Sequence, residues 1–369
     1  RARAEEGRLR ELGWREGLVD FCSNDYLGFA RDRELARRLE ERMQREVGVG
    51  LGATGSRLIS GHNSFFERLE SKIAAFHRAQ AALIFNSGYV ANLGLLACLP
   101  QRGDTVLYDE LCHASLRDGA RLSFAASYGF RHNDVDALRE KISRAKGQVF
   151  VVVESIYSMD GDFAPLRELT DVCREKEAAL IVDEAHATGV CGPNGEGRVV
   201  ELGLEEDVFA RVHTFGKALG SHGAAVLGDR ILCDYLVNFC RPFIYTTALP
   251  PHTLLCIEEA YNRLQSCPDC RLKLRRVIEL FYGVQQDFAQ ALLPSQSAIQ
   301  SVIIPGNKNV KAAALALQAQ GFDVRAIMSP TVARGKERLR ICLHAFNSDV
   351  EVRGLCRAVH EILREVRAT

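Results

Sequence analysis

Two residues of this chain, an amine and a carboxylate, stand where a reactive site would need them. Lys217 lies in the sequence Gly-Lys-Ala-Leu-Gly, whose small residues allow a ligand to approach closely. Asp183 closes the apolar run 179–183, and a buried carboxylate needs a polar partner. Chemistry with pyridoxal 5′-phosphate (PLP) requires a lysine that forms an imine with an aldehyde. It also requires a carboxylate that keeps a pyridine nitrogen protonated.

The sequence also offers groups for a phosphate and for a stacked ring. Ser87, Gly88 and Tyr89 follow the apolar run 81–85 and open a helix, where backbone N–H groups favour anions. His113 follows another apolar run, and its imidazole could stack on a pyridine. Taken singly, these residues also have ordinary structural explanations, as a solvated lysine, a turn-capping aspartate or a core histidine. Their order along the chain favours one shared cofactor site.

The elements that must position these residues form a mainly parallel sheet. Six short apolar runs alternate with helical patterns, at residues 81–85, 104–108, 149–154, 179–183, 211–215 and 224–228. This alternation predicts an α/β domain whose sheet is covered on both faces. In such sheets ligands bind at the carboxyl ends of the strands, where the polar residues lie. A helix is expected to begin at Ser64, with Ser64 and Glu67 forming a capping box.

The pattern changes after about residue 250. Pro250 and Pro251 precede long helices, and further elements follow, namely strands at 300–305 and 338–343 and helices at 310–320 and at the C-terminus. This pattern predicts a smaller α+β domain. We therefore expect an N-terminal segment over residues 1–35, a large α/β domain over 36–255 and a small domain over 256–369.

Composition argues against several classes of protein. Lys plus Arg and Asp plus Glu both total 47, so the basic excess that is typical of nucleic-acid binding is missing. No apolar run approaches the roughly 20 residues that cross a bilayer, and the charged residues 1–10 suggest a helix, not a signal peptide. The 12 cysteines are scattered, which is typical of thiols in a reducing compartment. We expect a cytoplasmic protein without a metal site, in which Cys267 and Cys270 lie in a loop between helices.

Two motifs indicate nucleotide binding but lack what that function needs. Residues 50–55 match G-x-G-x-x-G, yet a charged helix is expected before them where a dinucleotide site needs a strand. Residues 183–186 read Asp-Glu-Ala-His, as in some helicases, but the chain lacks a phosphate loop in which Ser or Thr follows the lysine. Both motifs are weaker indications than the arrangement around Lys217.

In their order, the motifs of this chain resemble those of the α-oxoamine synthases, PLP enzymes of the aspartate-aminotransferase fold (fold type I). The similarity runs from about Phe21 to the C-terminus. It is found in seven motifs: Cys22-Ser-Asn-Asp-Tyr-Leu-Gly28, Ser87-Gly-Tyr-Val-Ala-Asn92, Ser158-Met-Asp-Gly-Asp162, Asp183-Glu-Ala-His-Ala-Thr-Gly189, His213-Thr-Phe-Gly-Lys-Ala-Leu-Gly220, Tyr245-Thr-Thr-Ala-Leu-Pro-Pro251 and Arg338-Leu-Arg340.

The resemblance implies four catalytic residues. Lys217 would carry PLP as a Schiff base and then move the proton at the α-carbon of the substrate. Asp183 would pair with the pyridine nitrogen, and His186 would contact the 3′-oxygen of the ring. His113 would stack on the ring face.

The resemblance also implies binding residues. The phosphate would be held by the Ser87–Tyr89 segment through Gly88 and Tyr89, and by Thr214. Thr247 would reach the phosphate of the other subunit in a homodimer with shared active sites. The remaining implied residues lie near the ring or the substrate: Ser158 beside the ring, Asn24 near the substrate, and Arg340 at the substrate carboxylate.

Within the family, the motifs are most similar to the branch that condenses L-alanine with a pimeloyl thioester, on coenzyme A or an acyl carrier protein. That reaction releases CO2 and gives 8-amino-7-oxononanoate for biotin synthesis. Gly55-Ser-Arg-Leu-Ile-Ser-Gly61 belongs to this similarity, whereas Glu154-Ser155 and residues 343–347 depart from the commonest family sequence. Three sister enzymes share the cofactor residues and stay open as alternatives: 2-amino-3-ketobutyrate CoA ligase, serine palmitoyltransferase and 5-aminolevulinate synthase. The intact cofactor set argues against a catalytically silent subunit.

Overall fold

The computed structural model describes residues 12–13, 16–46 and 50–368, and side chains up to residue 365. The chain forms two compact units. The first unit comprises residues 1–28, 158–162 and 269–369, and the second comprises residues 29–157 and 163–268. The domain limits expected at residues 35 and 255 stay a prediction. The helix expected within residues 1–10 lies outside the described residues.

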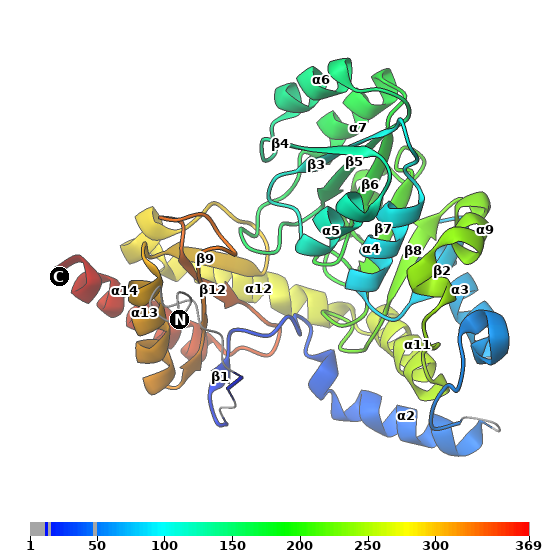
Figure 1. The fold of residues 1–369 in the computed structure, drawn as a ribbon. Coiled ribbons are helices and arrows are strands. Elements are labelled where there is room, and N and C mark those ends of the chain that lie inside the picture. The colour runs from blue at the N-terminus through cyan, green and yellow to red at the C-terminus, as the bar shows by residue number, and fades with distance from the viewer. Residues whose placement is uncertain (1–11, 14–15, 47–49, 369) are drawn as a thin grey trace. The chain divides into compact units, whose positions relative to one another are not determined.

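A seven-stranded sheet forms the centre of the second unit (Figure 1). Its order is β2-β8-β7-β6-β5-β3-β4, and β8 runs antiparallel to both of its neighbours while the other pairs are parallel. The strands are β2 (Ala81–Phe85), β3 (Thr105–Asp109), β4 (Ala126–Phe130), β5 (Val149–Glu154), β6 (Ala179–Asp183), β7 (Ala210–Thr214) and β8 (Ala224–Gly228). The predicted fold class, a mainly parallel α/β sheet, is confirmed.

Helices cover both faces of this sheet. One face packs against α4 (Gly88–Cys98), α5 (Ala114–Leu122), α9 (Arg230–Phe239) and α10 (Arg241–Ile244). The other face packs against α6 (Val135–Arg144), α7 (Leu166–Glu175) and α8 (Arg198–Leu202). The unit also contains α2 (Arg33–Arg45), α3 (Ser64–Phe76), α11 (Pro251–Ser266), a 3-10 turn at Phe29–Arg31 and a π turn at Arg57–Gly61. Apolar side chains on both faces explain why the strands read as continuous apolar runs.

The first unit contains two small sheets. β1 (Val19–Asp20) pairs with β10 (Phe322–Asp323), and the order of the other sheet is β11-β12-β9. That antiparallel sheet consists of β11 (Arg325–Ile327), β12 (Arg338–Cys342) and β9 (Ile299–Ile303). The helical elements are α12 (Pro268–Val284), a 3-10 segment at Gln286–Ala291, α13 (Asn307–Ala319) and α14 (Asp349–Ala368). The expected α+β character of the C-terminal part is confirmed.

The structure corrects two sequence predictions. The residue that caps α3 is Asn63, whose side chain accepts the N–H groups of Phe65 and Phe66. Ser64 is therefore the first helical residue, and the predicted capping box is wrong. β4 was not predicted, because Ala126 and Tyr128 of this edge strand are exposed and the strand lacks an apolar run.

Three further features concern a disulfide bond, the character of the helices and the side chains that could bind a metal ion. Cys267 is the C-cap of α11, Cys270 lies in the first turn of α12, and the two are disulfide-bonded. For this pair, the expectation of free thiols in a loop between helices is therefore wrong. Over the described part of the chain, none of the helices combines the length and apolar character that crossing a membrane requires. Among the same residues, His, Cys, Asp and Glu side chains form no group of three or more suited to a metal ion.

Candidate active site

Asp183 is a buried carboxylate at the carboxyl end of β6. Asp183 is only 4% exposed to solvent. Oδ1 accepts the N–H of Ala185 at 2.8 Å, and Oδ2 accepts Nδ2 of Asn92 at 2.7 Å. Neither donor carries a positive charge, so these two hydrogen bonds leave the carboxyl group without a cationic partner. A buried charge of this kind is suited to a protonated ring nitrogen.

A chain of hydrogen bonds connects Asp183 with His113. Asn92 also donates to Oγ of Ser115 at 3.0 Å. The N–H of Ser115 donates to Nδ1 of His113 at 3.2 Å, so this nitrogen is an acceptor. The Ser115 hydroxyl, 2.7 Å from the same nitrogen, must then be a second donor, and the ring proton lies on Nε2. Burial lowers the pKa of His113, which favours the neutral ring.

Asn92 and Ser115 are functional candidates that sequence reasoning missed. Both are buried, and together they fix the orientation of Asp183 and His113. Asn92 lies one helical turn after Gly88 in α4, facing the sheet. A polar residue on an otherwise apolar helix face is the signal that could have indicated it.

Lys217 and His186 lie together at the ends of two neighbouring strands. Lys217 follows β7 and His186 follows β6, and these strands pair in parallel. Nζ of Lys217 is 2.8 Å from Nε2 of His186. An ammonium group can only donate, so the imidazole accepts at this contact. Gly220 closes the lysine loop with φ +58, and a Cβ there would collide with the backbone of Ala30, so this position requires glycine.

The N-terminus of α4 contains the residues that were predicted to hold the phosphate. Ser87 is the N-cap, and its hydroxyl accepts the N–H of Val90 at 3.3 Å. The N–H groups of Gly88 and Tyr89 lie in the first turn, where a helix offers them no carbonyl partner. A Cβ on Gly88 would be 3.5 Å from Oγ1 of Thr214, which places the end of β7 beside this helix start.

Thr247 lies close to the segment that leads into α4. Nδ2 of Asn86 donates to the carbonyl oxygen of Thr247 at 2.9 Å, and Asn86 directly precedes Ser87. In the second unit the structure thus groups the predicted residues at one edge of the sheet, the edge formed by the carboxyl ends of β6 and β7.

Three predicted residues form a separate group in the first unit. Arg340 in β12 is 7% exposed. Its Nε donates to the Ser158 carbonyl at 2.6 Å, and its Nη2 donates to Oδ1 of Asn24 at 3.0 Å. Nη1 lies 2.9 Å from Sγ of Cys342. These contacts hold the guanidinium in a fixed plane, which is what the binding of a carboxylate requires.

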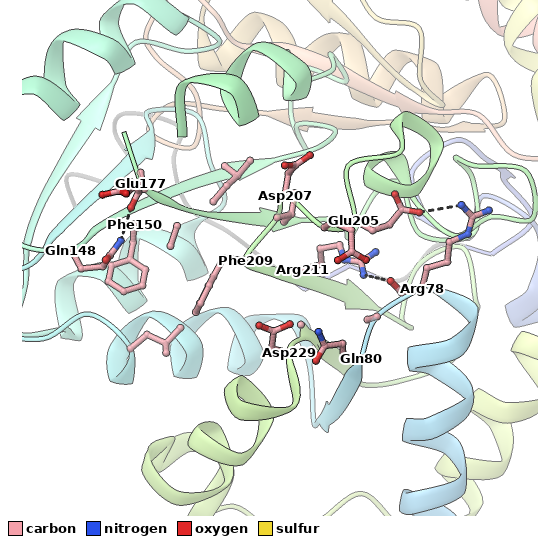
Figure 2. A pocket seen from close by; sticks show the side chains of 18 residues that line it. Arg78, Gln80, Gln148, Phe150, Glu177, Glu205, Asp207, Phe209, Arg211 and Asp229 are labelled. Carbon is pink, nitrogen blue, oxygen red and sulfur yellow. Dashed lines mark hydrogen bonds and ion pairs between the residues drawn. The ribbon is translucent and has the colours of Figure 1, made fainter. Parts of the chain in front are cut away.

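A hollow in the second unit lies at the opposite edge of the sheet (Figure 2). Its volume is about 530 Å³. Residues at the starts of the parallel strands contribute to it, among them Gln148, Phe150, Glu177, Asp207 and Phe209. None of the predicted site residues contributes to its lining. The hollow therefore does not belong to the candidate active site.

Comparisons with known proteins show the family of this chain. The family model described as aminotransferase class I and II matches residues 16–359. A relative named 8-amino-7-oxononanoate synthase, from Marinobacter nauticus, is 43% identical over 93% of this chain and 86% of its own length.

Solved structures show the same fold. A serine palmitoyltransferase from S. paucimobilis, with bound PLP and myriocin, has a TM-score of 0.89 and 28% identity, over 95% of this chain and 89% of that one. An 8-amino-7-oxononanoate synthase from Francisella tularensis has a TM-score of 0.82 and 26% identity, over 95% of this chain and 99% of that one. The expected fold type I is confirmed. With its lysine, aspartate and histidines in this order on this fold, the chain belongs to the aminotransferase class I and II family and, within it, to the α-oxoamine synthases.

Proposed function

We propose that this chain condenses L-alanine with a pimeloyl thioester, with loss of CO2, to make 8-amino-7-oxononanoate for biotin synthesis. The observation on which the proposal rests is the 43% identity, over 93% of the chain, to a relative of that name. The chain is an enzyme, a PLP-dependent transferase. Its particular substrates are the part that we propose.

The residues of the second unit fit PLP. Asp183 offers a buried carboxylate that its two hydrogen bonds leave without a cationic partner, which suits the pyridine nitrogen. The first turn of α4, at Gly88 and Tyr89, offers N–H groups for the phosphate, with Thr214 beside it. Lys217 supplies the primary amine for covalent attachment.

The two histidines complete the proposed cofactor site. Because Ser115 and Asn92 fix His113, its ring has one preferred orientation for stacking. His186, held near Lys217, is proposed to contact the 3′-oxygen of the ring. Ser158 is proposed to lie near the ring.

When bound, PLP supplies an electron sink that stabilises negative charge at the α-carbon of the amino acid. Lys217 removes the α-proton with Nζ and later returns a proton to the same carbon. His186, whose Nε2 faces Nζ, limits the directions in which that amine can point.

The first unit contributes the proposed anchor for the amino acid. The guanidinium of Arg340 is fixed by three contacts, including Ser158 and Asn24, and is proposed to bind the substrate carboxylate. An arginine is suited to this task because its planar fork pairs with both carboxylate oxygens.

The proposal includes a cytoplasmic homodimer in which Thr247 reaches the phosphate in the other subunit. Light scattering after gel filtration gives the mass, and a monomeric, fully active enzyme would contradict this part. A second candidate function is that of the sister enzyme serine palmitoyltransferase, which the TM-score of 0.89 favours over the value of 0.82 for the synthase structure. Sequence identity favours the first candidate.

The deciding experiment offers the PLP-loaded enzyme L-alanine, glycine or L-serine, each with pimeloyl-CoA, acetyl-CoA, succinyl-CoA or palmitoyl-CoA. We expect 8-amino-7-oxononanoate, CO2 and free coenzyme A in equal amounts from L-alanine and pimeloyl-CoA, detected by mass spectrometry. Preference for serine with palmitoyl-CoA, or for glycine with a short acyl-CoA, would reassign the chain to a sister enzyme. Pimeloyl-acyl carrier protein, tested in parallel, identifies the preferred thiol carrier.

A further inference from the structure

One carbonyl oxygen holds the turn that directly follows Asp183 and contains His186. The Glu184 carbonyl accepts the N–H of Ala187 at 3.0 Å and the N–H of Thr188 at 2.8 Å. The Thr188 hydroxyl donates to the same oxygen at 2.7 Å. Because the turn begins next to Asp183 and includes His186, these three donors fix the backbone that positions His186 relative to Asp183.

His213 is the second partner of the Thr188 hydroxyl. Its Nδ1 lies 2.9 Å from Oγ1 of Thr188. A hydroxyl has one hydrogen, and Thr188 already donates it to Glu184, so His213 must donate from Nδ1. The proton-free Nε2 is buried and has no hydrogen-bond partner among the described residues. Burial, followed by the nearby His77, keeps the pKa of His213 well below its usual value, so the ring is neutral.

The position of His213 is fixed from two sides. Its ring centroid lies 3.9 Å from that of His77. His77 is itself held, since its Nδ1 is 2.6 Å from the Glu196 carbonyl and its Nε2 is 2.8 Å from the Tyr261 hydroxyl. On the other side, a Cβ on Gly197 would come within 3.2 Å of Cε1 of His213, at a φ of +111 that favours glycine. The imidazole therefore has little room to rotate.

The Thr188–His213 contact joins the two segments that contain the catalytic candidates. Thr188 closes the turn after β6, and His213 lies in β7, four residues before Lys217. Nζ of Lys217 and Nε2 of His186 meet at 2.8 Å, so a shift of either segment would change that distance.

We propose that Thr188 and His213 are positioning residues, which hold the turn of Asp183 and His186 against the strand that leads to Lys217. The proposal deepens the proposed function, because it concerns the same site. His213 acts in one tautomer only, with the proton on Nδ1 and none on Nε2.

The variants Thr188→Val and Thr188→Ser test the role of the hydroxyl. Valine keeps the shape and removes the donor, whereas serine keeps the donor. We expect Thr188→Val to lower kcat by about 10- to 100-fold, with a smaller change in KM for the amino acid, because a misplacement of 1 Å costs about that much. It should also weaken PLP binding about tenfold. Thr188→Ser should restore both values to within about threefold of wild type.

Thr170→Val is the matched control. Thr170 and Thr188 are both 1% exposed, but the Thr170 hydroxyl has no hydrogen-bond partner among the described residues. The same substitution there should leave kcat and PLP binding unchanged. An equal loss in both valine variants would reduce the effect to core packing and overturn the proposal.

A second measurement does not need the PLP-loaded enzyme, and its first part uses the wild-type chain. Nitrogen-15 NMR of the histidine rings, in the full chain without PLP, should show His213 with a protonated Nδ1 and a bare Nε2. Thr188→Val should speed the exchange of that Nδ1 proton at least about tenfold. The opposite tautomer in wild type would overturn the proposal. An enzyme that binds PLP but makes none of the tested products would contradict the proposed function instead, and the NMR result would still decide this inference.

Discussion

The two edges of the seven-stranded sheet contain similar polar residues but hold them in different ways. At the carboxyl edge, buried hydrogen bonds join Asp183, Asn92 and Ser115. At the amino edge, carboxylates pair with partly exposed arginines, as in Arg78–Glu205 at 3.1 Å. Hydrogen bonds in a low-dielectric interior fix geometry strongly, whereas exposed ion pairs contribute little. In these examples, the carboxylate at the carboxyl edge is held by buried neutral donors, whereas the carboxylate at the amino edge is held by an exposed arginine.

Replacing Lys217 should have the largest effect. Lys217→Ala removes the amine at the carboxyl edge, so we expect the rate of product formation to fall by at least about 10⁴-fold. Lys217→Arg should lower this rate equally, since a guanidinium keeps the positive charge but does not form the imine. Visible absorption of the PLP-loaded protein, with and without borohydride, and product formation measure the loss. Substantial turnover by either variant would contradict the assignment.

The next largest effect is expected when the hydrogen bond from Asn92 to Asp183 is removed. Asn92→Ala leaves Asp183 and Ser115 each without one buried donor, so we expect the free energy of unfolding to fall by about 1–3 kcal/mol. PLP affinity should fall as well. Urea unfolding and a PLP titration measure both, and Asn238→Ala on the surface of α9 is the control. If Asn92→Ala bound PLP as wild type does, the hydrogen-bond chain would not explain the difference between the edges.

Acid should lower the free energy of unfolding, because the interior of the second unit contains buried histidines. Burial lowers the pKa of His77 to about 3, whereas an unfolded histidine titrates near 6.5. Between these two pKa values the unfolded chain binds a proton that the folded chain does not bind. The free energy of unfolding therefore has its full value above about pH 6.5 and falls as the pH drops towards 3. The loss is about 1.4 kcal/mol per pH unit for each such histidine.

Urea unfolding at pH 7, 6 and 5 measures this slope. His77→Gln should reduce it by about one histidine's share, because the variant has no group to titrate at that position. Equal slopes in wild type and variant would show that His77 is not the group responsible.

The smallest effect is expected at the amino edge. Arg78→Gln breaks the ion pair with Glu205, in which the arginine side chain is 56% exposed, so unfolding free energy should change by at most about 0.5 kcal/mol. The rate of product formation should stay at the wild-type value. A loss above about 1 kcal/mol, measured by urea unfolding, would mean that both edges depend on their polar contacts alike.

Sequence reasoning succeeded where a residue's neighbours along the chain decide its place. The apolar runs that became β5 and β6 were located without error, because strands covered on both faces need apolar residues at every position. The ends of β3 and β7 differ from the prediction by one residue. The positions of Asp183 and Lys217 at strand ends followed from those runs.

The sequence could not indicate contacts between residues that are distant along the chain. Asn92 and Asp183 are 91 positions apart in the sequence, and a pattern of neighbouring residues does not predict a contact over such a separation. The same holds for Thr188 and His213, whose roles depend on the pairing of β6 with β7. The prediction of the N-cap of α3 was wrong for a different reason. Asn63 and Ser64 are both good capping residues, and only the backbone geometry decides between them.

The order of strands in the sheet has a consequence for synthesis of the protein. β2 forms its hydrogen bonds with β8, so Phe85 meets Ala224 only after about 140 further residues have been made. At about 5–20 residues per second, a ribosome needs roughly 7–28 s for that stretch. During this interval Ala-Ala-Leu-Ile-Phe has no strand partner, and it resembles the short apolar segments that aggregate. Translation speed and chaperone access between β2 and β8 should therefore control how much of this enzyme matures in a cell.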